Sequence, residues 1–146
     1  MTGSSQSIVL AAGGTGGHMF PAEALAKVLK QRGHTLVWIT DERGAARHGL
    51  LSELQTHTIS ARGLAGFGAI GRLTGALSLG VGVFQARRIL KDLNPAAVIG
   101  FGGYAAAPTM MAAPLLKLRT AIHDQNAVVG MANRLFAKRV DQLCTS

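Results

Sequence analysis

A short apolar run that ends in a glycine-rich loop is the feature that most restricts the fold of this chain. Residues 7–21 read SIVLAAGGTGGHMFP, in which apolar residues typical of a buried strand precede four glycines, and Pro21 suits the first turn of a helix. Glycines let a ligand approach the backbone closely, and the free N–H groups of a helix N-terminus favour an anion. The segment predicts a strand, a phosphate-binding loop and a helix. A tight strand-to-helix reversal without a ligand is the alternative.

Neither of the two common phosphate fingerprints fits this loop. The GxGxxG frame uses Gly14 and Gly16 but meets Met19 at its third position, and the GxxxxGK[ST] frame from Gly13 reaches His18 with no lysine after it. Asp41 ends a predicted strand where dinucleotide-binding folds place a ribose-binding acid, which leaves that site as a further alternative.

Strand-like and helix-like patterns alternate along the whole chain, which predicts the α/β class with a doubly wound, parallel, Rossmann-like sheet. The chain of 146 residues, with 48% hydrophobic content, is long enough to form one domain. Apolar β-branched runs predict strands at 7–12, 35–40, 96–100, 120–123 and 141–145. Helical spacing of apolar residues predicts helices at 21–32, 83–93, 108–118 and 128–139.

Three polar or glycine-rich loops follow predicted strands: GGTGGH at 13–18, GFGGYAAAP at 100–108 and HDQN at 123–126. Right-handed crossovers bring every strand-to-helix loop of a parallel sheet to the same carboxyl edge. We therefore expect the three loops to form one binding crevice.

The polar side chains of these loops suggest acid–base chemistry. A helix N-terminus lowers the pKa of His18 and keeps it able to accept a proton as a general base, although it could instead contact a carbonyl or a phosphate. Asp124 is the second titratable group, with capping of the next helix as its alternative. Gln125 and Asn126 suit sugar hydroxyls or a base edge, and Tyr104 either orients its loop or packs.

Metal and cofactor chemistry are not expected, because the sequence has no Asp-x-Asp pair and no His/Cys/carboxylate cluster with ligand spacing. Cys144 is the single cysteine, and the first residues do not resemble a secretory signal. A cytoplasmic location is expected.

The net charge of +8 calls for an anionic partner. No acidic residue lies between Glu53 and Asp92, an interval that also holds the apolar, glycine-punctuated run at 63–84. Basic residues beside an apolar surface suit an anionic membrane face, and an apolar helix packed on the core is the alternative. A nucleic-acid partner is not expected, because neither a recognition helix nor a row of aromatic side chains that could stack on nucleobases accompanies the basic residues.

Taken together, the three loop motifs resemble the amino-terminal half of the MurG family, the glycosyltransferases of bacterial peptidoglycan synthesis that convert lipid I to lipid II. The resemblance implies a GT-B architecture, with residues 1–146 as the acceptor-binding Rossmann-like domain and a donor-binding carboxyl-terminal domain absent from this chain. It implies metal-independent, inverting transfer of N-acetylglucosamine from UDP-GlcNAc to the C4 hydroxyl of the muramoyl sugar. Without the donor domain, this chain alone is expected to turn over little or nothing.

The resemblance also implies roles for particular residues. His18 resembles the base, and Asp124 stands where this family commonly has glutamate, one methylene longer. The glycine loops resemble the acceptor diphosphate site, and Thr15, Gly16, Gly17 and Asn126 match positions that reach the donor. The full set of expected substrate-binding residues is Gly13, Gly14, Thr15, Gly16, Gly17, Gly100, Gly102, Gly103, Tyr104, Gln125 and Asn126.

A peripheral location on the cytoplasmic face of the bacterial inner membrane is implied as well. The expected membrane contacts are Phe67, Arg72, Leu79, Phe84, Arg87 and Arg88. Two alternatives remain at this point: a GT-B enzyme with another acceptor, and a membrane-surface or anion-binding module without chemistry.

Overall fold

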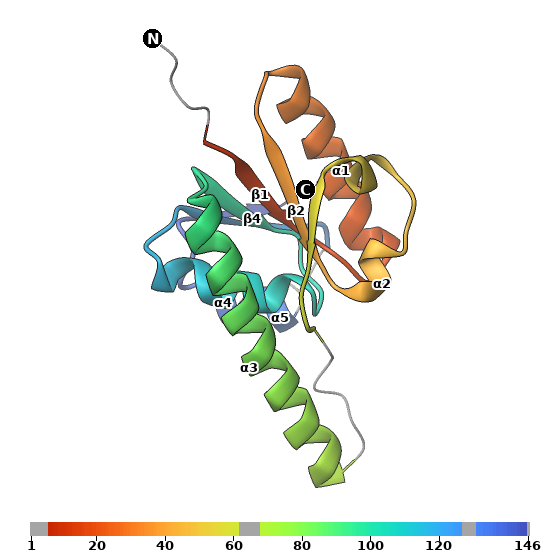
Figure 1. The fold of residues 1–146 in the computed structure, drawn as a ribbon, viewed down its shortest axis with the longest axis vertical. Coiled ribbons are helices and arrows are strands. Elements are labelled where there is room, and N and C mark those ends of the chain that lie inside the picture. Colours follow the sequence, from red (N-terminus) through yellow and green to blue (C-terminus); the bar gives the residue numbers. More distant parts are fainter. Residues whose placement is uncertain (1–5, 62–67, 127–130, 146) are drawn as a thin grey trace.

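Six parallel strands form one sheet at the centre of the computed structural model, which describes residues 6–61, 68–126 and 131–145 (Figure 1). The strand order is β3-β2-β1-β4-β5-β6, so the chain starts in the middle of the sheet and builds outward in both directions. The strands are β1 (Ile8–Ala11), β2 (Leu36–Thr40), β3 (Gln55–Thr58), β4 (Ala97–Gly100), β5 (Thr120–Asp124) and β6 (Gln142–Thr145). The predicted doubly wound α/β class is confirmed.

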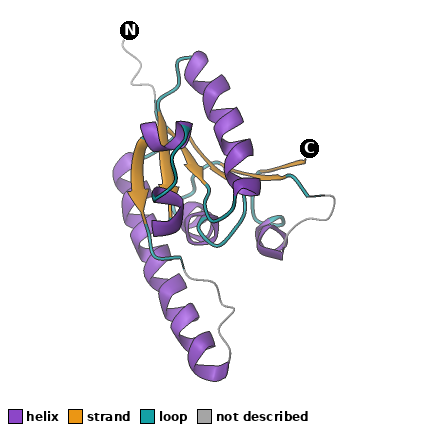
Figure 2. Ribbon diagram, turned by 90° about the vertical axis from the view of Figure 1, so that its right-hand side faces the viewer, coloured by secondary structure: helices purple, strands orange, loops and turns teal. Residues whose placement is uncertain are grey.

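Helices cover both faces of this sheet (Figure 2). They are α1 (Gly16–Gln31), α2 (Glu42–Ala45), the 3₁₀ turn η1 (Leu50–Glu53), α3 (Gly68–Leu93), α4 (Ala106–Leu115) and α5 (Met131–Phe136). Helix α1 packs on one face, whereas α3, α4 and α5 pack on the other. The lower half of α3 projects well beyond the sheet in Figure 1.

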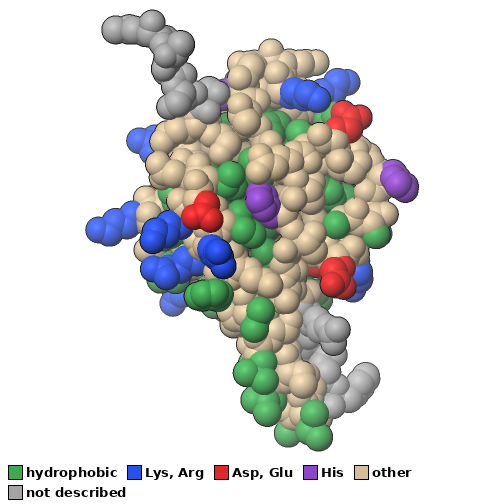
Figure 3. Space-filling view, in the orientation of Figure 1, with side chains coloured by type: hydrophobic (Ala, Val, Ile, Leu, Met, Phe, Trp, Pro, Cys, Tyr) green, Lys and Arg blue, Asp and Glu red, His purple; other side chains and the backbone are tan. Residues whose placement is uncertain are grey.

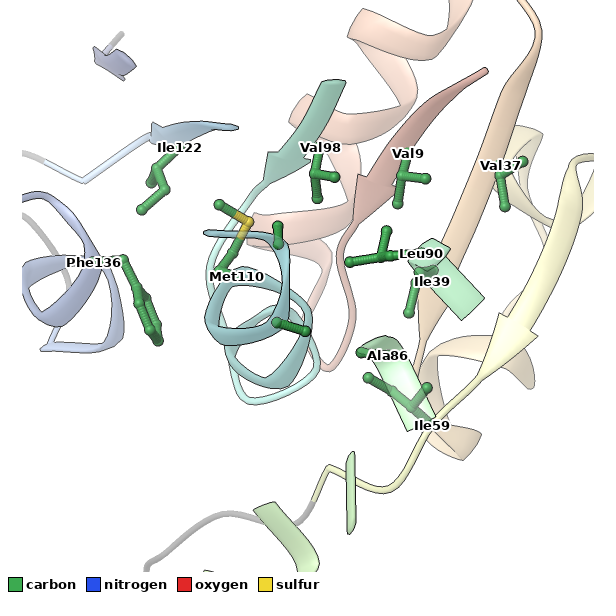
Figure 4. Packing of buried hydrophobic residues seen from close by; sticks show 12 residues of the cluster. Val9, Val37, Ile39, Ile59, Ala86, Leu90, Val98, Met110, Ile122 and Phe136 are labelled. Carbon is green, nitrogen blue, oxygen red and sulfur yellow. The ribbon is translucent and has the colours of Figure 1, made fainter. Parts of the chain in front are cut away.

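The core has two layers because successive side chains of a strand point to opposite faces. Val9, Val37 and Ile39 pack under α3 and α4, together with the residues drawn in Figure 4. Leu10 and Trp38 pack under α1 instead. Trp38 is fully buried and donates from Nε1 to the backbone oxygen of Ala12 at 2.9 Å, which ties β2 to the end of β1.

Several predicted boundaries were wrong. Helix α3 begins at Gly68, not at residue 83, and α4 begins at Ala106, before Pro108. Strand β3 was not predicted, because its sequence QTHT is polar and mostly exposed, as an edge strand allows. Residues 128–130 of the helix predicted at 128–139 lie outside the described residues. Cys144 lies in β6 as expected and is exposed.

Candidate active site

The three predicted loops meet at the carboxyl edge of the sheet, where β1 pairs with β2 on one side and β4 on the other. Helices α1 and α4 leave these strands toward opposite faces, which is the geometry that opens a crevice in such sheets. A Cβ on Gly103 would lie 3.1 Å from the backbone oxygen of Gly13, so the first two loops touch. A Cβ on Gly17 would lie 3.7 Å from Nε2 of Gln125, so the third loop lies against the first.

His18 lies where these loops converge, in the first turn of α1, and it is half-buried. Its Nδ1 lies 3.0 Å from the hydroxyl oxygen of Thr15, which fixes the orientation of the ring. The other side of the ring packs on the second loop. A Cβ on Gly102 would come within 3.0 Å of His18 Cδ2, and the φ of +89° at Gly102 is one that residues with a Cβ rarely adopt.

Burial lowers the pKa of His18 below its ordinary value, and the negative charge of Asp124 opposes this shift in part. The predicted lowering of the His18 pKa is therefore confirmed. Its main cause, however, is the loss of solvent around the imidazole and not the helix N-terminus. Because the shift favours the neutral form, His18 can accept a proton near pH 7.

Asp124 is fully buried and organises the third loop. Its Oδ1 accepts from the backbone N–H of Asn126 at 2.9 Å and from Asn126 Nδ2 at 3.0 Å. Its Oδ2 accepts from Nδ2 of Asn133 at 2.8 Å. The carboxylate thus closes a turn over residues 124–126 and fixes the side chain of Asn126. Its hydrogen bonds are structural, but the backbone N–H that it binds belongs to this loop and not to α5, which begins at Met131.

Asn133, on α5, is a functional candidate that the sequence analysis missed. It is buried, and its Nδ2 lies 3.5 Å from the backbone oxygen of His123 in addition to its bond with Asp124. A Cβ on Gly102 would lie 3.3 Å from the same nitrogen. The one signal in the sequence was a polar residue on the apolar helix predicted at 128–139, which does not identify its partner.

The remaining predicted residues surround this centre in different ways. Gly13 is buried where a Cβ would lie 2.7 Å from Cβ of Ala105, so only glycine allows the first loop to lie this close to the second. Gln125 Oε1 is buried without a hydrogen-bond partner among the described residues. Tyr104 is 51% exposed on the second loop.

Helix α3 carries an exposed apolar stripe on its outer side. Its members recur every three or four residues, so they share one side of the helix; they are Ile70, Leu73, Leu77, Val81 and Phe84. Hydrophobic side chains follow the projecting part of the molecule in Figure 3, with basic side chains where it joins the body. Of the predicted membrane contacts, Phe84, Arg72, Arg87 and Arg88 are exposed, Leu79 is partly buried on the opposite side of α3, and Phe67 lies outside the described residues.

Two further observations limit the chemistry of the described residues. No group of three or more His, Cys, Asp or Glu side chains within 6–61, 68–126 and 131–145 is placed to hold a metal ion. Over the same ranges, no helix combines the length and the apolar character needed to cross a bilayer.

Known proteins that resemble this chain are named as transferases, which agrees with a binding site at the carboxyl edge of the sheet. The transferase named UDP-N-acetylglucosamine--N-acetylmuramyl-(pentapeptide) pyrophosphoryl-undecaprenol N-acetylglucosamine transferase from Paramagnetospirillum magneticum is 60% identical over 95% of this chain and 38% of its own length. Its counterpart from Rhodospirillum rubrum is 57% identical over 95% of this chain and 36% of its own length. The chain therefore spans less than two fifths of the length of these curated relatives.

Solved structures of glycosyltransferases also resemble this chain. MurG of Acinetobacter baumannii aligns with a TM-score of 0.80 at 38% identity, over 95% of this chain and 40% of that one. The spinosyn rhamnosyltransferase SpnG aligns with a TM-score of 0.61 at 17% identity, over 88% of this chain and 38% of that one, which shows a shared fold alone.

The sheet order and the site at its carboxyl edge define a Rossmann-like domain of the GT-B glycosyltransferase class. Residues 8–145 match the glycosyltransferase family 28 N-terminal domain, and the chain belongs to that family.

Proposed function

We propose that this chain is the acceptor-binding part of an enzyme that transfers N-acetylglucosamine from UDP-GlcNAc to the C4 hydroxyl of the muramoyl sugar in lipid I. The names of the relatives supply the donor and the lipid-linked acceptor. The observation that carries the proposal is the convergence of three loops on His18, whose pKa is lowered by burial. Because the chain spans 38% of one relative, residues beyond this chain would supply the donor domain.

In the proposed reaction, His18 takes the proton from the acceptor hydroxyl. The hydroxyl oxygen then forms a bond to the anomeric carbon of the donor sugar, on the face opposite UDP. The bond between that carbon and the diphosphate oxygen breaks, UDP leaves with the electron pair, and the anomeric centre inverts. Thr15 supports this role because its hydroxyl lies 3.0 Å from Nδ1 and holds the ring in one orientation.

Asp124 would act through its neighbours. It is fully buried, its oxygens are engaged by Asn126 and Asn133, and its charge opposes the lowering of the His18 pKa. We therefore assign it a positioning and electrostatic role toward His18, and assign Asn126 to the sugar hydroxyls of the donor.

The acceptor diphosphate would lie on the glycine loops. The two glycine loops touch at the start of α1, where the helix dipole and the amides of the first turn favour a diphosphate. The N–H groups of Thr15 and Phe101 are already bonded to the carbonyls of Gly13 and Ala11. Gln125, with its buried unpartnered Oε1, is available to a donor group of the substrate.

The stripe on α3 would contact the inner leaflet of the bacterial membrane. Five large apolar side chains are 51% to 80% exposed, and Arg87, Arg88 and Lys91 follow them along the helix. Burial of such apolar side chains at the lipid boundary favours a peripheral location on the membrane, and so does the attraction between the basic side chains and anionic headgroups. Leu79 is not included, because it does not share the exposed side of α3.

Histidine replacements in the complete enzyme test the catalytic assignment. His18→Gln should lower turnover by roughly 10²- to 10⁴-fold, the range for loss of a general base, while acceptor binding persists. His34→Gln is the matched control, because His34 is exposed and lies at the far end of α1. Unchanged turnover in His18→Gln would instead support the alternative in which this domain only binds an anion and His18 takes no part in the reaction.

Binding to the chain itself tests the acceptor assignment. A short-chain lipid I analogue should shift the amide resonances of residues 13–18 and 100–104, whereas UDP-GlcNAc alone should shift them little. An analogue with a different sugar acceptor that shifts the same amides more strongly would favour a GT-B enzyme with another substrate.

A further inference from the structure

A cavity of about 620 Å³ opens beside the crevice of the three loops, and the proposed function leaves it unassigned. It lies at the carboxyl ends of β2 and β3, against α3. Its polar lining combines the acidic Asp41 and Glu42 with the basic Arg43 and the neutral Thr58, Ser60, Ser78 and Gln85. This volume falls within the range of roughly 300–1,000 Å³ that is common for small-molecule sites.

The cavity lies close to the first glycine loop. A Cβ on Gly13 would lie 3.1 Å from Oδ1 of Asp41, which lines the cavity, and 2.8 Å from the hydroxyl oxygen of Thr40, immediately before it. One side chain therefore separates the loop from the cavity. Asp41 is itself buried, so a ligand held at the loop would pass over this side chain to reach the cavity.

The polar groups that line the cavity suit a peptide backbone better than they suit a nucleoside. The hydroxyl groups of the lining offer donors and acceptors, and Gln85 offers its Nε2, while its Oε1 already accepts from the backbone N–H of Ser60 at 2.7 Å. The exposed guanidinium of Arg43 lies 3.3 Å from Oδ2 of Asp41 and has further N–H groups that can bind a carboxylate. Strand β3 is at the edge of the described sheet, so its outer side has no neighbouring strand there and can accept an extended peptide.

The ribose alternative for Asp41 fits less well. Its Oδ1 already accepts from the backbone N–H of Gly44 at 2.9 Å, and its Oδ2 lies 3.3 Å from Nη2 of Arg43. A ribose diol would have to compete with both of these contacts.

We propose that this cavity holds the peptide of the acceptor. The inference rests on the proposed function, in which the diphosphate occupies the glycine loops and the lipid lies toward α3. The names of the relatives include a pentapeptide on the muramyl sugar, and the cavity lies between α3 and the first glycine loop.

Two soluble acceptor analogues with the same short lipid and diphosphate, one carrying the pentapeptide and one lacking it, test the inference by calorimetry with this chain. We expect the peptide to tighten binding about tenfold, the effect of one or two new hydrogen bonds. Ser78→Leu, which fills the cavity from α3, should remove this gain and leave binding of the peptide-free analogue within about twofold.

Thr74→Leu is the matched control, because Thr74 is exposed one turn earlier on α3 and does not line the cavity. It should leave both dissociation constants unchanged. Arg43→Gln provides a second variant at an exposed side chain, where misfolding is not expected, and should reduce the gain from the peptide.

The outcomes separate this inference from the proposed function. Equal binding of the two analogues would overturn the peptide site and leave the glycine-loop assignment standing. Equal weakening of both analogues by Ser78→Leu would also overturn it, as would shifts of the Thr58 and Ser60 amides by UDP-GlcNAc. If neither analogue binds, the proposed acceptor function fails and the peptide site fails with it.

Discussion

Replacing Gly102 with alanine tests whether the second loop holds His18 in place. Gly102 has a φ of +89°, and an added Cβ would lie 3.0 Å from His18 Cδ2 and 3.3 Å from Nδ2 of Asn133. Carbon atoms prefer separations of about 3.5–4.0 Å, so the histidine ring must move by a few tenths of an ångström. The substitution therefore combines backbone strain with a collision at the proposed base.

The two costs can be separated with a second glycine. Gly33 has a φ of +82°, but an added Cβ there would have nothing within 4 Å. Gly33→Ala should therefore lower the free energy of unfolding by about 1–2 kcal/mol, the cost of a left-handed residue with a Cβ. Gly102→Ala should lower it by about 2–5 kcal/mol, because an overpacking cost of about 1–3 kcal/mol adds to the strain.

Urea unfolding of both variants measures these free energies, and the imidazole resonances of His18 report the displacement of the ring. We expect Gly102→Ala to shift these resonances and Gly33→Ala to leave them in place. Equal destabilisation by the two variants, with an unmoved His18, would refute the packing of the second loop on the base.

Four further predictions rest on individual residues and contacts. Asp124→Asn should lower the pKa of His18 further, because the carboxylate now opposes the shift caused by burial, and an NMR titration of the imidazole measures this; an increase would contradict it. Since the pKa of His18 is lower in the folded state, its contribution to stability should be complete above the ordinary value of 6.5 and decline as the pH falls below it, which urea unfolding at several pH values would show. Trp38→Phe should cost about 1–3 kcal/mol in thermal or urea unfolding, because a buried backbone carbonyl loses its donor at 2.9 Å; a cost near zero would mean that water replaces the indole. Leu77→Gln should weaken binding to anionic vesicles in a sedimentation assay more than Ala76→Gln does, because Leu77 lies on the exposed stripe and Ala76 is exposed outside it.

The convergence of the three loops could be predicted because it depends on local patterns and a general rule. Each strand leading into a loop is short and apolar, and parallel connectivity fixes the edge at which the loops meet. The contact between Gly103 and the first loop is a direct consequence of that rule.

The partner of Asp124 could not be predicted in the same way. Asn133 lies on a different element, and its hydrogen bond depends on how α5 packs against β5. Strand β3 was missed for a related reason: its polar residues form an edge strand only because β2 offers a free edge.

The two sides of α3 bear on the interpretations that the sequence left open for the basic, apolar region. A helix that serves only the core buries its large side chains and exposes its small ones. Over residues 68–86 this helix does the reverse for most of its length: its buried residues there are Gly75, Gly82 and Ala86, and five of its large apolar residues are exposed, whereas Leu79 and Val83 are partly buried. A side chain at Gly82 would collide with the backbone oxygen of Ser60, so close packing against the body explains the small residues. It does not explain the large ones, and their stripe, which leads toward Arg87 and Arg88, is the observation that supports the proposed contact with an anionic lipid surface.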